Sequence, residues 1–140
     1  MSEAKQLILY GDPVGKGRPR FAKRGGHVQA YTPEKTVEYE DRLKAAWVET
    51  HGNFGFPEKV PLCMVVLAYV KPAESLSKKR RQALLGTPCL KKPDADNIAK
   101  IVMDGLQGVA FPDDAAVYCV SSTKIYDETP RIEVAIWEVE

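Results

Sequence analysis

Short apolar runs separated by turn residues mark several segments of the chain as strands. Residues 60–70 form the longest run, and they are rich in β-branched residues and too few for a buried helix, so we expect a central strand. Residues 131–139 place Ile132, Val134 and Ile136 in alternation, as in a strand with one buried face. The other expected strands are residues 5–10, 27–31 and 116–126, and the Gly- and Pro-rich residues 11–20 predict a loop.

Two longer segments have the spacing of amphipathic helices. Thr32 and Pro33 should open the first, because threonine can cap a helix and proline is tolerated at its first position, and this helix should reach about Thr50. Its expected buried face consists of Val37, Leu43, Ala46 and Trp47, with Tyr39 outside the narrowest stripe.

The second long helix is expected over residues 96–109. Its packed face consists of Ile98, Ile101, Val102 and Gly105, and its opposite side carries Asp96, Asn97, Lys100 and Asp104. A shorter basic helix should begin after Ser75 or Ser77 and end near Leu85, where Gly86 follows.

The resulting order, ββαβαββ, describes an α+β domain (α/β in the wider sense) with a mixed sheet and two main helices. A chain of 140 residues makes one domain, residues 1–140, that can bury a core without disulfides or zinc. The spacing of Cys63, Cys89 and Cys119 fits no disulfide framework, so we expect buried thiols in a cytoplasmic protein. Residues 1–5 lack the start of a secretion signal and residues 60–70 are too short to span a bilayer, so no membrane partner is expected.

Charge is divided unevenly along the chain. Before Asp94 there are 17 Lys and Arg against 9 Asp and Glu, and from Asp94 onward there are 3 against 10, so a net +8 precedes a net −7. Basic patches suit a phosphate backbone, although a run such as residues 78–81 is as often a solvated helix face. The candidate DNA-binding cations are Lys16, Arg18, Arg20, Lys78, Lys79, Arg80, Arg81, Lys91 and Lys92.

Acidic residues gather beside cations in residues 91–100 and again in residues 112–114. Carboxylate oxygens are hard ligands for Mg²⁺ or Mn²⁺, which suggests metal-assisted phosphate chemistry. Ordinary helix chemistry offers an alternative for the first group, with Asp94 as N-cap and Asp96 paired with Lys100. For the second group, the alternative is a simple turn at Asp113 and Asp114.

Two other phosphate or metal motifs do not match. Residues 11–17 have three rather than four residues between the first two glycines of a P-loop, and Gly17 stands where Ser or Thr should be, so no nucleotide cofactor is expected. A calcium loop starting at Asp94 would have Ala99 in place of glycine and Gly105 in place of glutamate.

The stretch KPDADNIAKIVMDGL followed by FPDDAAV resembles the signature of RusA-type endodeoxyribonucleases, the Holliday junction resolvases often carried by phages and prophages. The segments GDPVGKGRPRF and YTPEKTVEYEDRL are also similar to the opening strand, basic loop and first helix of that family. The resemblance implies a small α/β fold, a homodimer, Mg²⁺ dependence and cleavage of branched DNA such as a four-way junction.

By position, the resemblance implies four catalytic residues: Asp94, Asp96, Lys100 and Asp114. Asp94, Asp96 and Asp114 would hold the metal, with Asp113 as a further candidate ligand, and Lys100 would stabilise negative charge that develops on the phosphate. The expected reaction is DNA hydrolysis by paired symmetric nicks in recombination and repair. The alternatives are a nuclease for other branched or flapped DNA, and a catalytically silent DNA-binding module.

Two structural questions follow from these expectations. A helix of roughly fourteen residues is about 21 Å long, so Asp114 reaches Asp94 only if the helix is shorter or tilted, or if a dimer supplies the acidic pair. Phe21, Tyr31 and Phe111 could stack at a branch point, but we expect core or loop packing for each.

Overall fold

The computed structural model describes residues 3–140. Met1 and Ser2, which belong to the segment expected to lack a secretion signal, lie outside the described residues. Its main sheet has the order β1-β6-β4-β5. The outer pair β1–β6 and the central pair β6–β4 are antiparallel, whereas β4 and β5 are parallel, so the predicted mixed sheet is confirmed. The four strands are β1 (Lys5–Tyr10), β4 (Leu62–Val70), β5 (Val117–Tyr126) and β6 (Arg131–Glu138).

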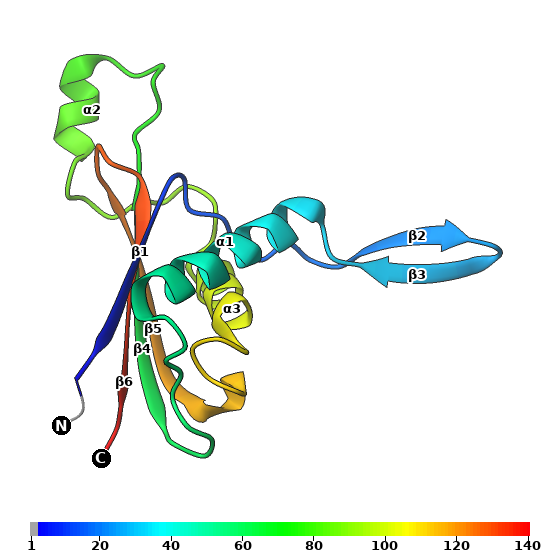
Figure 1. Ribbon diagram of the computed structural model, residues 1–140. Coiled ribbons are helices and arrows are strands. Elements are labelled where there is room, and N and C mark those ends of the chain that lie inside the picture. The colour runs from blue at the N-terminus through cyan, green and yellow to red at the C-terminus, as the bar shows by residue number, and fades with distance from the viewer. Residues whose placement is uncertain (1–2) are drawn as a thin grey trace.

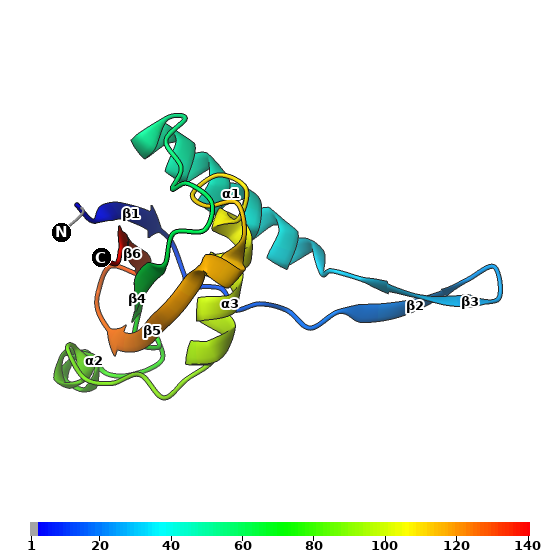
Figure 2. The ribbon, with the colours of Figure 1, turned by 90° about the horizontal axis from the view of Figure 1, so that it is seen from below.

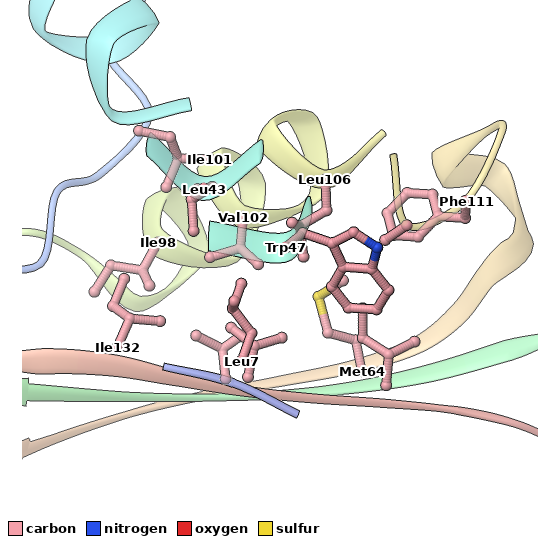
Figure 3. Close-up of a cluster of buried hydrophobic side chains, with 14 of the residues drawn as sticks. Leu7, Leu43, Trp47, Met64, Ile98, Ile101, Val102, Leu106, Phe111 and Ile132 are labelled. Carbon is pink, nitrogen blue, oxygen red and sulfur yellow. The ribbon is translucent and has the colours of Figure 1, made fainter. Parts of the chain in front are cut away.

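Two helices, α1 (Glu34–His51) and α3 (Ala95–Leu106), lie together on one face of this sheet (Figures 1 and 2). The alternation of β4 explains the layer, because Leu62, Met64 and Val66 are fully buried while the residues between them are only half-buried. Figure 3 shows Trp47 of α1 near Met64 and Phe111, with Ile98 and Val102 of α3 above the sheet. This α+β arrangement is the predicted fold class.

The start and buried face of α1 differ from the prediction. Pro33, not Thr32, is the residue before the first turn, and it makes no side-chain cap, because its ring has no hydrogen-bonding atom. Its backbone carbonyl accepts from the N–H groups of Thr36 and Val37. Leu43 and Trp47 are buried as predicted, but Val37 is exposed and Tyr39 is buried, the reverse of what was expected for these two residues. The stripe is rotated because α1 packs against α3 as well as the sheet, and Gly105 of α3 lies against Leu43.

A free-standing hairpin precedes α1. It consists of β2 (Arg20–Arg24) and β3 (His27–Tyr31), which pair only with each other. We call residues 20–31 the arm; it projects far from the body of the domain (Figure 1). Only β3 was predicted, and β2 was missed. Gly25 and Gly26, with φ of 57° and 82°, form the two-residue turn with left-handed backbone that favours hairpins.

The remaining elements lie between β4 and β5. The short basic helix α2 (Lys78–Leu84) begins at Ser77, whose hydroxyl accepts from the N–H of Arg80, as predicted. A 3₁₀ turn, η1 (Asp114–Ala116), leads into β5. None of the helices within residues 3–140 has the length and apolar composition needed to traverse a bilayer.

The cysteines are only partly as expected. All three are free and Cys89 is buried, but Cys63 is half-buried and Cys119 is exposed. The expectation of three buried thiols is therefore wrong for Cys119, because that residue lies on β5, which forms an edge of the sheet.

Candidate active site and nucleic-acid interface

A tight turn after α3 brings Asp114 back beside the helix. The helix ends at Leu106, three residues earlier than predicted, and Gly108, with φ of 95°, donates its N–H to the carbonyl of Phe111. The buried Phe111 ring, packed as predicted, anchors the turn in the core. Gln107 Oε1 then accepts from the N–H of Asp114. As a result, Asp114 Oδ2 lies 3.8 Å from Lys100 Nζ.

Lys100 and Asp114 are the end of a row of alternating charges. Lys100 Nζ is 3.0 Å from Asp104 Oδ1, and Asp104 Oδ2 is 3.0 Å from Lys16 Nζ. Lys16 also donates to Glu40 Oε2 at 2.7 Å. The row therefore joins α1, the loop before the arm, α3 and η1 through opposite charges, which is how a polar cluster avoids the cost of unpaired charge.

The pKa shifts of the central pair follow from this pairing. Burial works against the charge on Asp104, but hydrogen bonds from Lys100 and Lys16 outweigh it and hold the pKa of that carboxyl below its usual range. Burial also disfavours the charge on Lys16, and the hydrogen bonds to Glu40 and Asp104 outweigh it and raise the pKa of the ammonium group. Both groups therefore stay charged around neutral pH.

The glycine-rich loop is held against both helices by its backbone. Lys16 N–H donates to the carbonyl of Asn97 at 2.8 Å, and Gly17 N–H donates to Thr36 Oγ1 at 3.1 Å. A Cβ on Gly15 would lie 2.9 Å from Cβ of Pro93, closer than real contacts allow. Glycine is therefore required at position 15 for the loop to approach the start of α3.

Asp94 occupies the N-cap position of α3 but makes no side-chain cap, so the capping explanation for this residue is wrong. Its carboxylate instead pairs with Lys92 Nζ at 2.9 Å. The hydrogen bond from Lys92 and the charges of Lys92, Lys124 and Arg18 lower the pKa of Asp94. Asp94 thus stays ionised in a basic setting that would also attract a phosphate.

Asp96 is exposed in the first turn of α3, and its Oδ1 accepts from the N–H of Asn97 at 2.9 Å. Lys100 makes its short ion pair with Asp104, not with Asp96 as the helix-pair alternative supposed. Asp113 Oδ1 accepts from the N–H of Ala115 and caps η1. Of the predicted acidic ligands, Asp114 is therefore brought to Lys100, one helical turn beyond Asp96.

The acidic residues fit a divalent cation by their chemistry. Within residues 3–140 no three Asp, Glu, His or Cys side chains converge closely enough to hold an ion by themselves. Two of these carboxylates lie beside lysines instead, Asp94 beside Lys92 and Asp114 beside Lys100. Mg²⁺ usually takes only one or two protein carboxylates and completes its shell with water and substrate phosphates. Asp94 and Asp96, partly or fully exposed, offer such oxygens.

Several predicted DNA-binding cations surround one hollow. A cavity of about 670 Å³ lies between the glycine-rich loop, the start of α1 and the segment before α3. Its basic lining includes Arg18, Arg20 and Lys92, and also Lys35, which is not among the cations predicted to bind DNA. Lys91 is not part of this lining, and its carbonyl accepts a hydrogen bond from Lys124 Nζ. Lys16 is turned inward to Glu40 and Asp104.

The basic residues of α2 lie elsewhere. Both views show α2 apart from α3 and from the arm (Figures 1 and 2). Lys78 and Arg81 line a separate hollow of about 410 Å³ with Lys71 and Glu128, while Lys79 and Arg80 are exposed. The structure therefore does not bring residues 78–81 to the acidic group.

Sequence reasoning missed Glu40 and Lys124 altogether. Glu40 is one of several acids on α1, and only the tertiary contact with Lys16 distinguishes it. Lys124 lies on β5, and its Nζ reaches back to the segment before α3. No local signal in the sequence marks either residue, because each partner is distant along the chain.

The family model of the endodeoxyribonuclease RusA matches residues 10–137. An uncharacterized protein, YqaN of Bacillus subtilis (strain 168), is 36% identical over 141 residues, covering 96% of each chain. A crossover junction endodeoxyribonuclease, rusA of Lactococcus phage r1t, is 27% identical over 128 residues, covering 91% of each chain. The matched region includes the glycine-rich loop, α3 and η1. The chain therefore belongs to the RusA family of endodeoxyribonucleases.

Proposed function

We propose that this protein is a Mg²⁺-dependent nuclease that resolves four-way DNA junctions by paired, symmetric nicks. The family supplies the class of reaction, an endodeoxyribonuclease that acts on Holliday junctions. The observation that carries the assignment to this site is the contact between Lys100 and Asp114, which places a cation and a carboxylate from separate elements on one surface.

In this proposal, Asp94, Asp96 and Asp114 would hold the metal ion, with Asp113 as a secondary candidate, and binding of the ion would have to draw together carboxylates that do not converge without it. When bound, Mg²⁺ supplies Lewis-acid polarisation of the scissile phosphate. Mn²⁺ has the same preference for hard oxygen ligands and should substitute for it. Two cations, Lys92 and Arg18, lie near Asp94 and attract the phosphate backbone to the same place.

Lys100 acts on the phosphate directly and is placed by its neighbours. Asp104 holds the ammonium group at 3.0 Å, and Lys16 and Glu40 hold Asp104 in turn. A preorganised charge of this kind needs no rearrangement when negative charge develops on the phosphate oxygens. Asp104, Lys16 and Glu40 are thus positioning residues in the proposal, whereas Lys100 is catalytic.

We further propose that the enzyme is a homodimer. A four-way junction has near two-fold symmetry and must be cut in two strands, and one site per chain matches this with a C2 dimer. Light scattering on the purified protein measures its oligomeric state directly. A monomer in both the free and the DNA-bound protein would contradict paired nicking by a dimer.

The deciding experiment incubates the protein with a labelled four-way junction, a linear duplex and a flap, each with EDTA, Mg²⁺ or Mn²⁺. Symmetric nicks confined to the junction and dependent on the metal are expected. Equal cutting of the duplex would indicate a general nuclease, and preferential cutting of the flap would indicate another branched substrate. Junction binding without any cut would indicate a silent DNA-binding module.

A further inference from the structure

The arm has no partner layer among the described residues. β2 and β3 pair from Arg20 with Tyr31 to Arg24 with His27, and neither strand pairs with the main sheet. All five residues of β3 are exposed. Both views show the arm extending away from α1 and α3 (Figures 1 and 2).

An isolated two-stranded ribbon is at best marginally stable in water, so an arm of this kind needs something to lie against. Its apolar side chains are on the surface: Phe21 is 71% exposed, Val28 is 68% exposed and Tyr31 is 48% exposed. By the alternation of the strands, Phe21 and Val28 share one face and Tyr31 lies on the other. Neither face has a core of its own.

Charge identifies the kind of surface that the arm would meet. Residues 17–33, which contain the arm and both of its connections, carry the cations Arg18, Arg20, Lys23 and Arg24 and no Asp or Glu. A basic ribbon with exposed aromatic rings combines the two contacts that nucleic acids offer, phosphate charge and base stacking. An acid-free segment of this length has no charge partner within itself.

The position of the arm links it to the active site. Arg18, Pro19 and Arg20 at one end of the arm and Pro33 at the other line the cavity that Lys92 and Pro93 also line. Lys92 in turn pairs with Asp94. DNA that follows the arm toward the domain would therefore reach the predicted catalytic carboxylates.

We propose that the arm lies along a groove of a duplex branch of the DNA substrate and holds that branch against the active site. The proposal rests on the proposed function and adds to it the surface that holds the duplex beyond the cleavage point. Five residues per strand extend about 17 Å, and a two-stranded ribbon fits the major groove, which is about 12 Å wide.

An arm-less variant tests this directly. Arg20 and Tyr31 are paired across the ribbon, so residues 21–30 can be replaced by Gly-Gly, which closes a two-residue turn at the same spacing. Fluorescence anisotropy in EDTA measures junction affinity without cleavage, and light scattering measures the oligomeric state. We expect affinity to fall by about tenfold or more with the oligomeric state unchanged. Unchanged affinity would overturn the proposal.

The same measurements separate DNA from a protein partner. Loss of the oligomer in the arm-less variant without DNA would also overturn the proposal, because the arm would then bind a second copy of the chain. Failure of the proposed function would give a different result. If the parent protein binds the junction but never cuts it, the comparison of its affinity in EDTA with that of the arm-less variant still tests the arm.

A point variant keeps the result independent of folding of the shortened chain. Lys23→Glu reverses one exposed charge on the arm and should weaken binding several-fold and reduce the salt dependence by about one phosphate contact. Lys5→Glu makes the same charge change on β1, far from the arm in Figure 1, and should have a much smaller effect. Equal effects of the two substitutions would contradict a contact specific to the arm.

Discussion

Lys100 Nζ and Asp114 Oδ2 lie 3.8 Å apart, although one residue is in the middle of a helix and the other follows the turn after it. The contact exists because α3 ends at Leu106 and Gln107 accepts the N–H of Asp114, so the chain reverses at once. The helix is shorter than expected, but it brings Asp114 to Lys100 and not to Asp94, and within residues 3–140 no three acidic side chains converge on one point. No partner chain is needed to bring Asp114 to Lys100.

Asp114→Asn should abolish junction cleavage and leave junction binding unchanged, because it removes a charged ligand and keeps the size of the side chain. The ion pair with Lys100 is long and only partly buried, so the free energy of unfolding should change by less than about 1 kcal/mol. Cleavage assays, anisotropy and urea unfolding measure the three quantities. Undiminished cleavage would remove Asp114 from the site.

Asp113→Ala is the matched comparison. Asp113 caps η1, so this substitution should lower the free energy of unfolding by about 1 kcal/mol and leave substantial cleavage. If Asp113→Ala abolishes cleavage while Asp114→Asn does not, the two aspartates exchange roles in the metal site.

Lys16→Gln should destabilise the protein more than it weakens DNA binding. The substitution leaves Glu40 and Asp104, whose side chains are 15% and 22% exposed, without their shared cation. After allowance for solvent screening, we expect a loss of about 1–2 kcal/mol in the free energy of unfolding. Lys35 is exposed in the lining of the cavity, so Lys35→Gln should weaken DNA binding more than it lowers the free energy of unfolding. Equal unfolding free energies for Lys16→Gln and the parent would contradict this stabilising role, and a loss of junction binding in the same variant would place Lys16 among the DNA contacts instead.

Gly15→Ala should push the glycine-rich loop away from α3. The added Cβ would lie 2.9 Å from Cβ of Pro93 and 3.0 Å from Cβ of Asn97, and neither atom is the free end of a flexible side chain. Overpacking of this kind costs about 1–3 kcal/mol, and thermal or urea unfolding measures it. A stable variant with full cleavage would show that the loop can move without consequence for the site.

The ion pair of Asp127 with Arg131 gives the fold a dependence on pH that is separate from catalysis. The N–H of Thr129 and the guanidinium of Arg131 lower the pKa of Asp127. A lowered pKa contributes stability above the ordinary aspartate pKa of about 3.9, and this stability is lost as pH falls through the lowered value.

Asp127→Asn should therefore reduce the free energy of unfolding at pH 7, and the difference from the parent should shrink below about pH 4. Urea unfolding from pH 3 to 7 measures this, with Glu128→Gln, an exposed neighbour, as the control. A difference that is constant over the whole range would mean that the carboxylate charge is not the cause.

Local patterns predicted most of the elements because their cause is local. The apolar spacing of Ile98, Ile101 and Val102 identified the packed face of α3, and all three are fully buried. β2 was missed although Gly25-Gly26 between two short segments is a hairpin signal. Phe21 and Tyr31 were wrongly expected to pack in the core or in loops, since aromatic residues are usually buried and nothing local shows that the arm leaves the domain.

The site could be predicted only in part. Family resemblance identified Asp94, Asp96, Lys100 and Asp114, and the metal-binding role of the aspartates and the catalytic role of Lys100 stay predictions. The contacts of Glu40 with Lys16 and of Lys124 with Lys91 depend on how distant segments meet, which no periodicity encodes. The same is true of α2, whose basic sequence suggested a DNA surface but whose place in the fold is away from the acidic group.

In the glycine-rich loop, a backbone hydrogen bond fixes the path of the chain, whereas the charge lies on the side chain of Lys16. Its tether to α3 is the N–H of Lys16 on the carbonyl of Asn97, and any residue other than proline can make that bond. A related enzyme could therefore exchange the side chain at position 16 and alter the charge around Lys100 while the loop keeps its course. Evolution can adjust the electrostatics of this surface without moving the loop, provided that the acids paired with Lys16 change with it.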